Sequence, residues 1–202
     1  MRPRAAMALA AMVIATVGLT IAIPGRRGWF DIGVYHDAVT YWAGGHGGLY
    51  AFIRPGSPYG FTYPPFAAIC MAPMALLGWH PTIVINLALT VAASIFLLHC
   101  WMQPLIRRNG WNPRYAYPIA ACLFALLVPV RDTFSYGQIN LILVALVYAD
   151  LRLLARGRRV PVGIGVGLAA AIKLTPAIFI VYFLFTRRWR AAATSLATAA
   201  LA

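Results

Sequence analysis

Asp31 and Asp37 are the residues of this chain whose type and position best suit acid–base chemistry. They follow the first long apolar segment and are two of only four acidic residues among 202, all four of them Asp. Carboxylates are costly near lipid and persist there mainly where they are paired or functional. We therefore predict that Asp31 acts as a general base, which must come within about 3 Å of the hydroxyl group that it deprotonates.

Both carboxylates also have structural interpretations. Asp31 could cap the helix that follows it, since Asp is favoured at the position before the first helical turn. Asp37 could bind sugar hydroxyl groups, or it could form an ion pair with Arg26 or Arg27. The six-residue spacing of the two Asp residues differs from the Asp-x-Asp pattern of metal–diphosphate sites, so we predict no metal ion.

Arg131 and Lys173 are candidates for binding a phosphate group. Arg offers a planar bidentate fork, and Lys offers a compact point charge. Lys173 has 13 uncharged residues on each side, and an isolated cation within apolar sequence is by default a functional candidate. Two alternatives stay open: Arg131 could pair with Asp132, and the side chain of Lys173 could extend along apolar surface to reach water.

Three further polar side chains are candidates for contacting a substrate. The amides of Gln138 and Asn140 suit sugar hydroxyl groups, although they could equally hydrogen-bond between helices. Tyr63 directly precedes Pro64 and Pro65, and a proline in the first turn favours a rigid helix start. We therefore expect a structural role for this segment, with Tyr63 as a candidate substrate contact.

The elements that carry these residues are predicted to be transmembrane helices. The chain is 62% hydrophobic and 10% charged, with a mean hydropathy of +0.76, whereas soluble domains are about 25% charged. Backbone in lipid must satisfy its own hydrogen bonds, which favours helices. We predict an all-α, polytopic transmembrane helix bundle that forms one domain over residues 1–202. Its apolar segments are Ala5–Ile23, Leu76–Trp101 with an interruption at Gly78–Pro81, Tyr115–Val130, Ile139–Ala155 and Val160–Phe185.

The net charge of +13 comes largely from arginines that lie in short clusters between apolar segments. This arrangement is typical of cytoplasmic loops, so we predict membrane lipids and no nucleic acid as partners. The implied orientation makes residues 24–63 a long extracytoplasmic loop and places Asp150 beside a cytoplasmic cluster as its counter-charge. The N-terminal apolar segment lacks a small-residue cleavage site and is interpreted as an uncleaved anchor rather than a signal peptide.

Two apolar segments are expected to be shorter or broken. Pro176 cannot donate a backbone hydrogen bond and disfavours helix before it, so Val160–Phe185 is predicted to break at Lys173–Pro176 into half-helices of about 12 residues, each about 18 Å long. Pro64–Leu77 is interpreted as a short re-entrant piece, because a full span needs about 20 residues. A short helix is also expected over Ile32–Tyr41, within the long loop.

Four polar segments fall on the same, extracytoplasmic side in this orientation, and their convergence predicts a site. They are residues 31–37, the corner 61–65, residues 131–140 and Lys173. The chain ends with the apolar run Ala191–Ala202, directly after an arginine cluster. That run is typical of the start of another span, so we expect the sequence to be the N-terminal part of a longer protein.

Several short motifs, in their order and spacing, resemble one family of membrane enzymes. The motifs are Asp31–Tyr35, Gly48–Tyr50, Phe61–Phe66, Ala72–Leu77, Tyr136–Asn140, Asp150–Leu151, Ala171–Pro176 and Arg187–Arg190. Together they are similar to the bacterial polyprenol-phosphate-mannose-dependent alpha-(1→2) mannosyltransferases, which are integral membrane enzymes of the GT-C superfamily. The resemblance covers Phe30–Ala202.

The resemblance implies a function and a location. The donor would be a mannosyl group on polyprenol phosphate, the acceptor a mannoside or glycolipid, and the transfer inverting. The protein would be a multi-pass, GT-C-like protein of the cytoplasmic membrane with its active site outside and no cofactor. Asp31 matches the family's first-loop acidic residue, taken as the general base; Arg131, Gln138, Asn140 and Lys173 match other polar motifs. The alternatives are a non-catalytic transporter or lipid-binding scaffold, or a transferase for another lipid-linked sugar.

Overall fold

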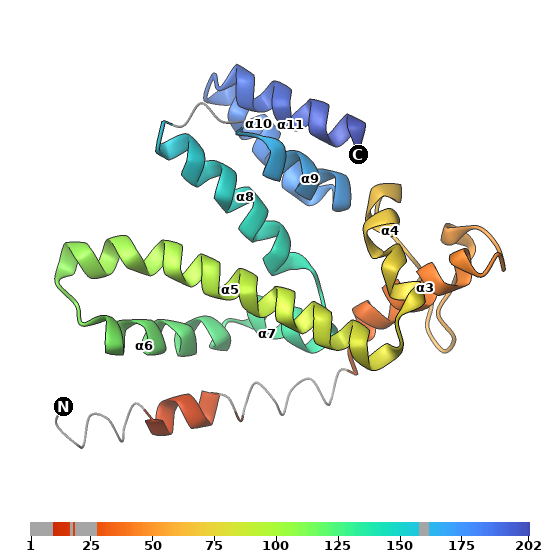
Figure 1. Cartoon of the computed structure of the whole chain (residues 1–202), viewed down its shortest axis with the longest axis horizontal. Coiled ribbons are helices and arrows are strands. Elements are labelled where there is room, and N and C mark those ends of the chain that lie inside the picture. Colours follow the sequence, from red (N-terminus) through yellow and green to blue (C-terminus); the bar gives the residue numbers. More distant parts are fainter. Residues whose placement is uncertain (1–9, 17, 19–27, 158–161) are drawn as a thin grey trace. The chain divides into compact units, whose positions relative to one another are not determined.

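The computed structural model describes residues 10–16, 18, 28–157 and 162–202. Within these ranges the regular structure is helical (Figure 1), apart from one antiparallel bridge between Ile53 and Gly60, and the all-α prediction is confirmed. The helices are α3 (Phe30–Ala43), η1 (Leu49–Ala51), α4 (Pro65–Met71), η2 (Ala72–Leu76), α5 (Trp79–Asn109), α6 (Pro113–Leu126), α7 (Val128–Tyr136), α8 (Asn140–Ala155), α9 (Ile164–Ile172), η3 (Thr175–Ala177), α10 (Ile178–Phe185) and α11 (Trp189–Leu201).

The chain folds into two compact units, each of which joins segments that are distant in sequence. The first unit comprises Met1–Ile32 and Ile83–Leu141, and the second comprises Gly33–Thr82 and Ile142–Ala202. The predicted site residues are divided between them. The first unit contains Asp31, Arg131, Gln138 and Asn140, and the second contains Asp37, Tyr63 and Lys173.

α5, almost wholly in the first unit, is the element best suited to cross a membrane. It has 31 residues and is, in the part of the chain that the structure describes, the one single helix long and apolar enough to do so. The sequence predicted this apolar segment over Leu76–Trp101 with an interruption at Gly78–Pro81, whereas the helix begins within that interruption, at Trp79, and continues to Asn109. Pro81 fits this later start, because the missing N–H costs no helical hydrogen bond in a first turn. The polytopic arrangement stays a prediction.

The chain bends within the predicted span Tyr115–Val130, and whether this segment crosses the membrane stays a prediction. α6 and α7 are together long and apolar enough for one span, but they meet at an angle of 72°. Leu127 between them is extended, with φ −64° and ψ 129°. Pro129 lies at the start of α7 and cannot continue the hydrogen-bond ladder of α6. The bend places Arg131 near the beginning of α7.

The predicted break before Pro176, in the second unit, is confirmed. α9 ends at Ile172, Lys173 is extended with φ −146° and ψ 131°, and η3 begins at Thr175. The half-helices are shorter than expected, with 9 residues in α9 and 8 in α10. One reason is that η3 takes up the three residues around Pro176.

Small residues allow α9 to pack closely against α11. A Cβ atom at Gly167 would lie 2.6 Å from the backbone oxygen of Ser195 and 2.6 Å from Cβ of Thr198. Ser195 and Ala192 are themselves buried. Close backbone approach between small residues is typical of helix pairs in membranes, and it makes this pair a core of the second unit.

α3 extends the predicted helix Ile32–Tyr41 at both ends. Asp31 therefore lies inside its first turn rather than before it, and the capping interpretation of Asp31 is wrong. A carboxylate at this position still interacts favourably with the positive end of the helix dipole.

Two predictions about membrane segments are only partly tested. α4 and η2 form a short apolar helical segment, Pro65–Leu76, which is too short for a full span, as expected for Pro64–Leu77; its re-entrant path stays a prediction. The first predicted span, Ala5–Ile23, is helical at residues 10–16 and 18. Its other residues lie outside the described ranges, so the uncleaved anchor stays a prediction.

Candidate active site

A chain of side-chain hydrogen bonds in the first unit begins at Asp31. Nε2 of Gln138 donates to Oδ2 of Asp31 at 2.5 Å. Nδ2 of Asn140 donates in turn to Oε1 of Gln138 at 2.7 Å. All three side chains are half-buried. We call this arrangement the amide chain; it joins the predicted base to two residues more than 100 positions away.

The turn between α7 and α8 brings Gln138 to Asp31. α7 ends at Tyr136, and Gly137 adopts the left-handed conformation, with φ 71° and ψ 37°. A Cβ atom at this position would lie 2.6 Å from Cγ2 of Ile32, the residue after Asp31. Glycine is thus required both by the backbone conformation and by the close approach of Ile32.

Arg131 has an unusual environment within the first unit. Its Nε atom is buried and has no hydrogen-bond partner among the described residues. The alternative pairing with Asp132 is absent from the ion pairs found in the described part of the chain. Buried donors in proteins nearly always have a partner, so an anionic ligand is a fitting partner for this guanidinium group.

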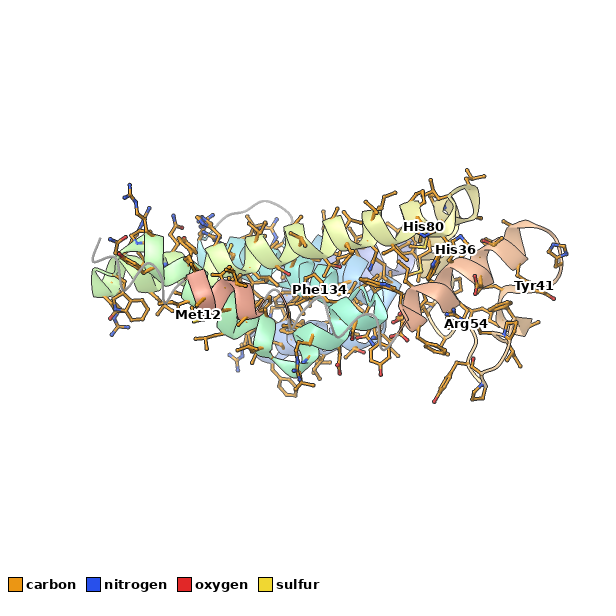
Figure 2. All side chains as sticks on the ribbon, turned by 90° about the horizontal axis from the view of Figure 1, so that it is seen from below. Met12, His36, Tyr41, Arg54, His80 and Phe134 are labelled. Atoms are coloured by element: carbon orange, nitrogen blue, oxygen red, sulfur yellow. The ribbon has the colours of Figure 1, made fainter. Side chains whose placement is uncertain are left out.

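An apolar groove of about 590 Å³ lies in the first unit. Its walls come from the N-terminal segment, α5, α6 and α7, and they include Val13, Ile95, Ala125, Val130 and Phe134. Figure 2 labels Phe134 on α7. Val130, which lines the groove, directly precedes Arg131 in the sequence, and Arg131 is half-buried.

The second unit contains a cluster formed by Lys173 and two tyrosines. Nζ of Lys173 donates to Oη of Tyr63 at 3.4 Å and lies 5.2 Å from the centroid of the Tyr63 ring. Oη of Tyr63 is also 2.7 Å from Oη of Tyr35. The break at Pro176 leaves Lys173 outside the helices, in extended backbone. The side chain of Lys173 is therefore held against Tyr63 rather than extended freely toward water.

Tyr35 contacts the candidate site residue Tyr63, and the sequence did not single it out. Its side chain is 4% exposed, and its ring packs edge-on against that of Tyr63 at a centroid distance of 5.1 Å. Tyr35 does occur in the motif Asp31–Tyr35. Its spacing of four residues from Asp31, one helical turn, was the available signal.

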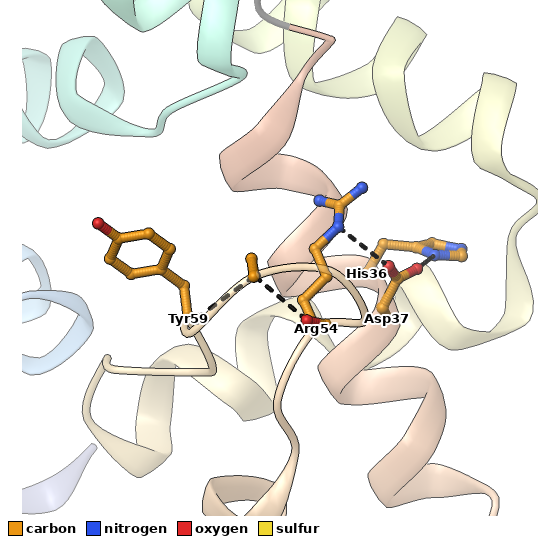
Figure 3. Close-up of polar contacts among 5 residues, drawn as sticks. His36, Asp37, Arg54 and Tyr59 are labelled. Carbon is orange, nitrogen blue, oxygen red and sulfur yellow. Dashed lines mark hydrogen bonds and ion pairs between the residues drawn. The ribbon is translucent and has the colours of Figure 1, made fainter.

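Asp37 lies in a different polar group of the second unit (Figure 3). Its Oδ2 is 3.8 Å from Nε of Arg54, and its Oδ1 is 3.2 Å from Nδ1 of His36. Arg26 and Arg27, the partners considered from the sequence, lie outside the described residues. The ion-pair interpretation thus gains support with a different arginine, and the sugar-binding role of Asp37 stays a prediction.

The interpretation of Asp150 as a counter-charge to the arginine cluster is wrong. Asp150 is only 3% exposed, and its Oδ2 accepts a hydrogen bond from the backbone N–H of Val166 at 2.8 Å. Val166 lies in the first turn of α9, whose N–H groups have no partner within the helix. Asp150 therefore ties the start of α9 to α8. Sequence reasoning missed this role because the two residues are 16 positions apart.

The family model of glycosyltransferase family 87 matches residues 61–202. The chain belongs to glycosyltransferase family 87. The resemblance inferred from the short motifs is confirmed. Five of the predicted site residues of this family 87 chain lie in the matched range, namely Tyr63, Arg131, Gln138, Asn140 and Lys173, while Asp31 and Asp37 precede it.

Relatives with curated names support the same family. One relative is the polyprenol-phosphate-mannose-dependent alpha-(1-2)-phosphatidylinositol mannoside mannosyltransferase of Mycobacterium tuberculosis, to which the family 87 chain is 34% identical over 189 residues. The match covers 85% of this chain and 43% of the relative. A second relative is the polyprenol-phosphate-mannose-dependent alpha-(1-2)-phosphatidylinositol pentamannoside mannosyltransferase of Mycolicibacterium smegmatis, to which the chain is 35% identical over 200 residues. This match covers 96% of the chain and 46% of the relative. The chain thus spans less than half the length of these relatives. No solved structure matches it.

Proposed function

We propose that this family 87 chain takes part in transferring a mannosyl group from a polyprenol phosphate donor to a phosphatidylinositol mannoside or a related glycolipid. The observation that carries the proposal is its 35% identity, over 96% of its length, to an enzyme named for that donor and acceptor. The amide chain on Asp31 supplies the chemical counterpart, because it holds a half-buried carboxylate in one position.

The reaction needs a base and a leaving group. The acceptor hydroxyl oxygen attacks the anomeric carbon of the mannosyl group while Asp31 takes the hydroxyl proton. The new bond forms between that oxygen and the anomeric carbon. The bond from the anomeric carbon to the phosphate oxygen breaks, and its electron pair leaves with polyprenol phosphate. Attack from the face opposite the phosphate inverts the anomeric configuration.

Arg131 and Lys173 are suited to the negative charge that develops on the departing phosphate. Fixed cations that need no reorganisation stabilise such charge in the transition state. Two features of the structure support these roles. Nε of Arg131 is buried without a partner in the described chain, and Lys173 is held against the hydroxyl and ring of Tyr63.

The apolar groove lined by Val130 and Phe134 is suited to the isoprenoid tail of the same donor. Its volume of about 590 Å³ is within the range of about 300–1,000 Å³ that is common for small-molecule sites. The groove suits the apolar tail, and Nε of Arg131, the residue after the groove residue Val130, suits the anionic phosphate. This match favours polyprenol phosphate over an uncharged lipid.

We also propose that the protein is a multi-pass protein of the cytoplasmic membrane. α5 is long and apolar enough for one span, and the bent pair α6–α7 could supply another. Arg107 and Arg108 lie in the last turn of α5, and basic residues favour the cytoplasmic side. The opposite end of α5 would then lie outside, where the predicted active site is expected.

A transfer assay with Asp31→Asn tests the proposal. We expect the full chain, in membrane vesicles, to move labelled mannose from polyprenol phosphate mannose to phosphatidylinositol mannosides. The Asn variant should lose about 10²–10⁴-fold in rate, the usual contribution of a general base, while its insertion stays normal. Asp132→Asn is the matched control and should keep the rate.

The proposal fails if the unaltered chain transfers no mannose, or if Asp31→Asn transfers it at the unaltered rate. Binding of the donor without any transfer would favour a lipid-binding scaffold or transporter instead. Transfer of a different sugar from the same lipid phosphate would retain the chemistry and change the donor.

A further inference from the structure

The geometry points to Gln138 as a positioning residue that orients Asp31, with Asn140 fixing Gln138 in turn. This inference rests on the proposed role of Asp31 as the base. Of the two interpretations of these amides that the sequence left open, it develops hydrogen bonding within the protein rather than contact with sugar hydroxyl groups.

The hydrogen bonds of Gln138 define one orientation of its amide. Its NH₂ group donates to the carboxylate of Asp31, and its carbonyl oxygen accepts from Asn140. Rotating the amide by half a turn would place an oxygen against the carboxylate and an NH₂ group against the NH₂ group of Asn140. Both bonds would be lost. Asn140 therefore selects the orientation in which Gln138 can hold Asp31.

The bond also selects one oxygen of the carboxylate. Gln138 binds Oδ2 of Asp31, so the proton of an incoming hydroxyl group is directed to Oδ1. Hydrogen bonds to a charged acceptor are stronger than those between neutral groups. Such a bond can hold a carboxylate in a single rotamer in a half-buried setting.

The backbone around Gln138 is itself fixed. The N–H of Gln138 donates to the carbonyl oxygen of Thr133 at 2.9 Å, which closes the end of α7. Gly137 packs against Ile32, next to the base, and Asn140 is the first residue of α8. The amide is thus anchored to two helices, as a group that positions another must be.

Kinetics of Gln138→Ala separate a positioning role from a sugar-binding role. A base displaced by about 1 Å can cost about 10²-fold in rate, so we expect kcat to fall by about 10–100-fold. The KM values for donor and acceptor should change by less than about twofold, because no binding contact is removed. Gln103→Ala, at the only other glutamine of the chain, is the matched control and should leave both constants unchanged.

A double-mutant cycle tests whether Asn140 acts through Gln138. We expect Asn140→Ala to lower kcat less than Gln138→Ala does. The double variant should be no slower than Gln138→Ala alone, because two residues that act as one unit are not additive. Two independent sugar ligands would instead give multiplied losses and raised KM values.

Folding and the proposed function are checked separately. Thermal unfolding in detergent should show that Gln138→Ala and the more conservative Gln138→Asn both fold. Gln138→Asn, which is one methylene too short, should still show the fall in kcat. If Asp31→Asn abolishes transfer but Gln138→Ala raises KM at constant kcat, the positioning role is wrong and the proposed function stands. If Asp31→Asn keeps full activity, the proposed function itself is wrong.

Discussion

Lys173 illustrates how a single cation can be fixed within apolar sequence. It is the only lysine of the chain and lies where α9 ends, in extended backbone. The aromatic face and hydroxyl group of Tyr63 lie within reach of its ammonium group. Cation–π contact and a hydrogen bond together restrict a side chain that otherwise has many rotamers. The restriction suits a group that must meet developing charge.

Replacing Lys173 should therefore affect the chemical step. We expect Lys173→Ala to lower kcat by about 10²–10³-fold, the range seen when one fixed transition-state donor is removed. Tyr63→Phe keeps the ring beneath the cation and should cost much less. Steady-state kinetics with polyprenol phosphate mannose measure both. An unchanged kcat in Lys173→Ala would exclude a role in stabilising the phosphate.

At the scale of elements, α9 is positioned by contacts from two sides. Asp150 of α8 binds the N–H of Val166 at its start, and α11 packs against its glycine face. Because α9 leads directly into Lys173, these contacts also determine where that cation lies. The buried carboxylate of Asp150 thus has a structural role, and removing it should lower the free energy of unfolding.

Asp150→Ala should destabilise the chain. It leaves the first N–H groups of α9 without their buried acceptor, which costs about 1–3 kcal/mol. Asp150→Asn keeps an acceptor oxygen and should cost less. Thermal or denaturant unfolding in detergent measures the difference. Arg156→Ala serves as the comparison, since an equal loss there would restore the counter-charge interpretation.

At the scale of the whole molecule, the proposed donor has two parts that need different surroundings. The apolar groove of the first unit would hold the tail, and Arg131 would meet the phosphate. α6 carries a second apolar groove of similar volume, lined in part by Ala120 and Trp111. We assign the tail to the groove lined by Val130 and Phe134, and the second groove provides a matched comparison.

Filling the groove should weaken binding of long donors selectively. We expect Ala125→Phe to raise the KM for a long-chain polyprenol phosphate mannose by about tenfold, a change that corresponds to about 1.4 kcal/mol. A donor with a single short isoprenoid tail should be unaffected. Ala120→Phe, in the second groove, is the control. Equal effects of Ala125→Phe on both donors would show that this groove does not hold the tail.

The sequence alone determined the helical class, the break at Pro176, the family and most of the candidate residues. Composition, proline chemistry and short motifs are local properties, and they can be read without knowing what packs against what. The bend at Leu127 was missed because its cause, Pro129, lies in an otherwise continuous apolar run.

Only the tertiary structure decided how these residues are used. It joins Asp31 to Gln138 across 107 positions and Lys173 to Tyr63 across 110, and it turns Asp150 from a surface charge into a helix anchor. Hydrogen-bond partners depend on the close approach of distant segments, such as Ile32 on Gly137. No local pattern encodes such an approach, because packing of the whole unit sets those distances.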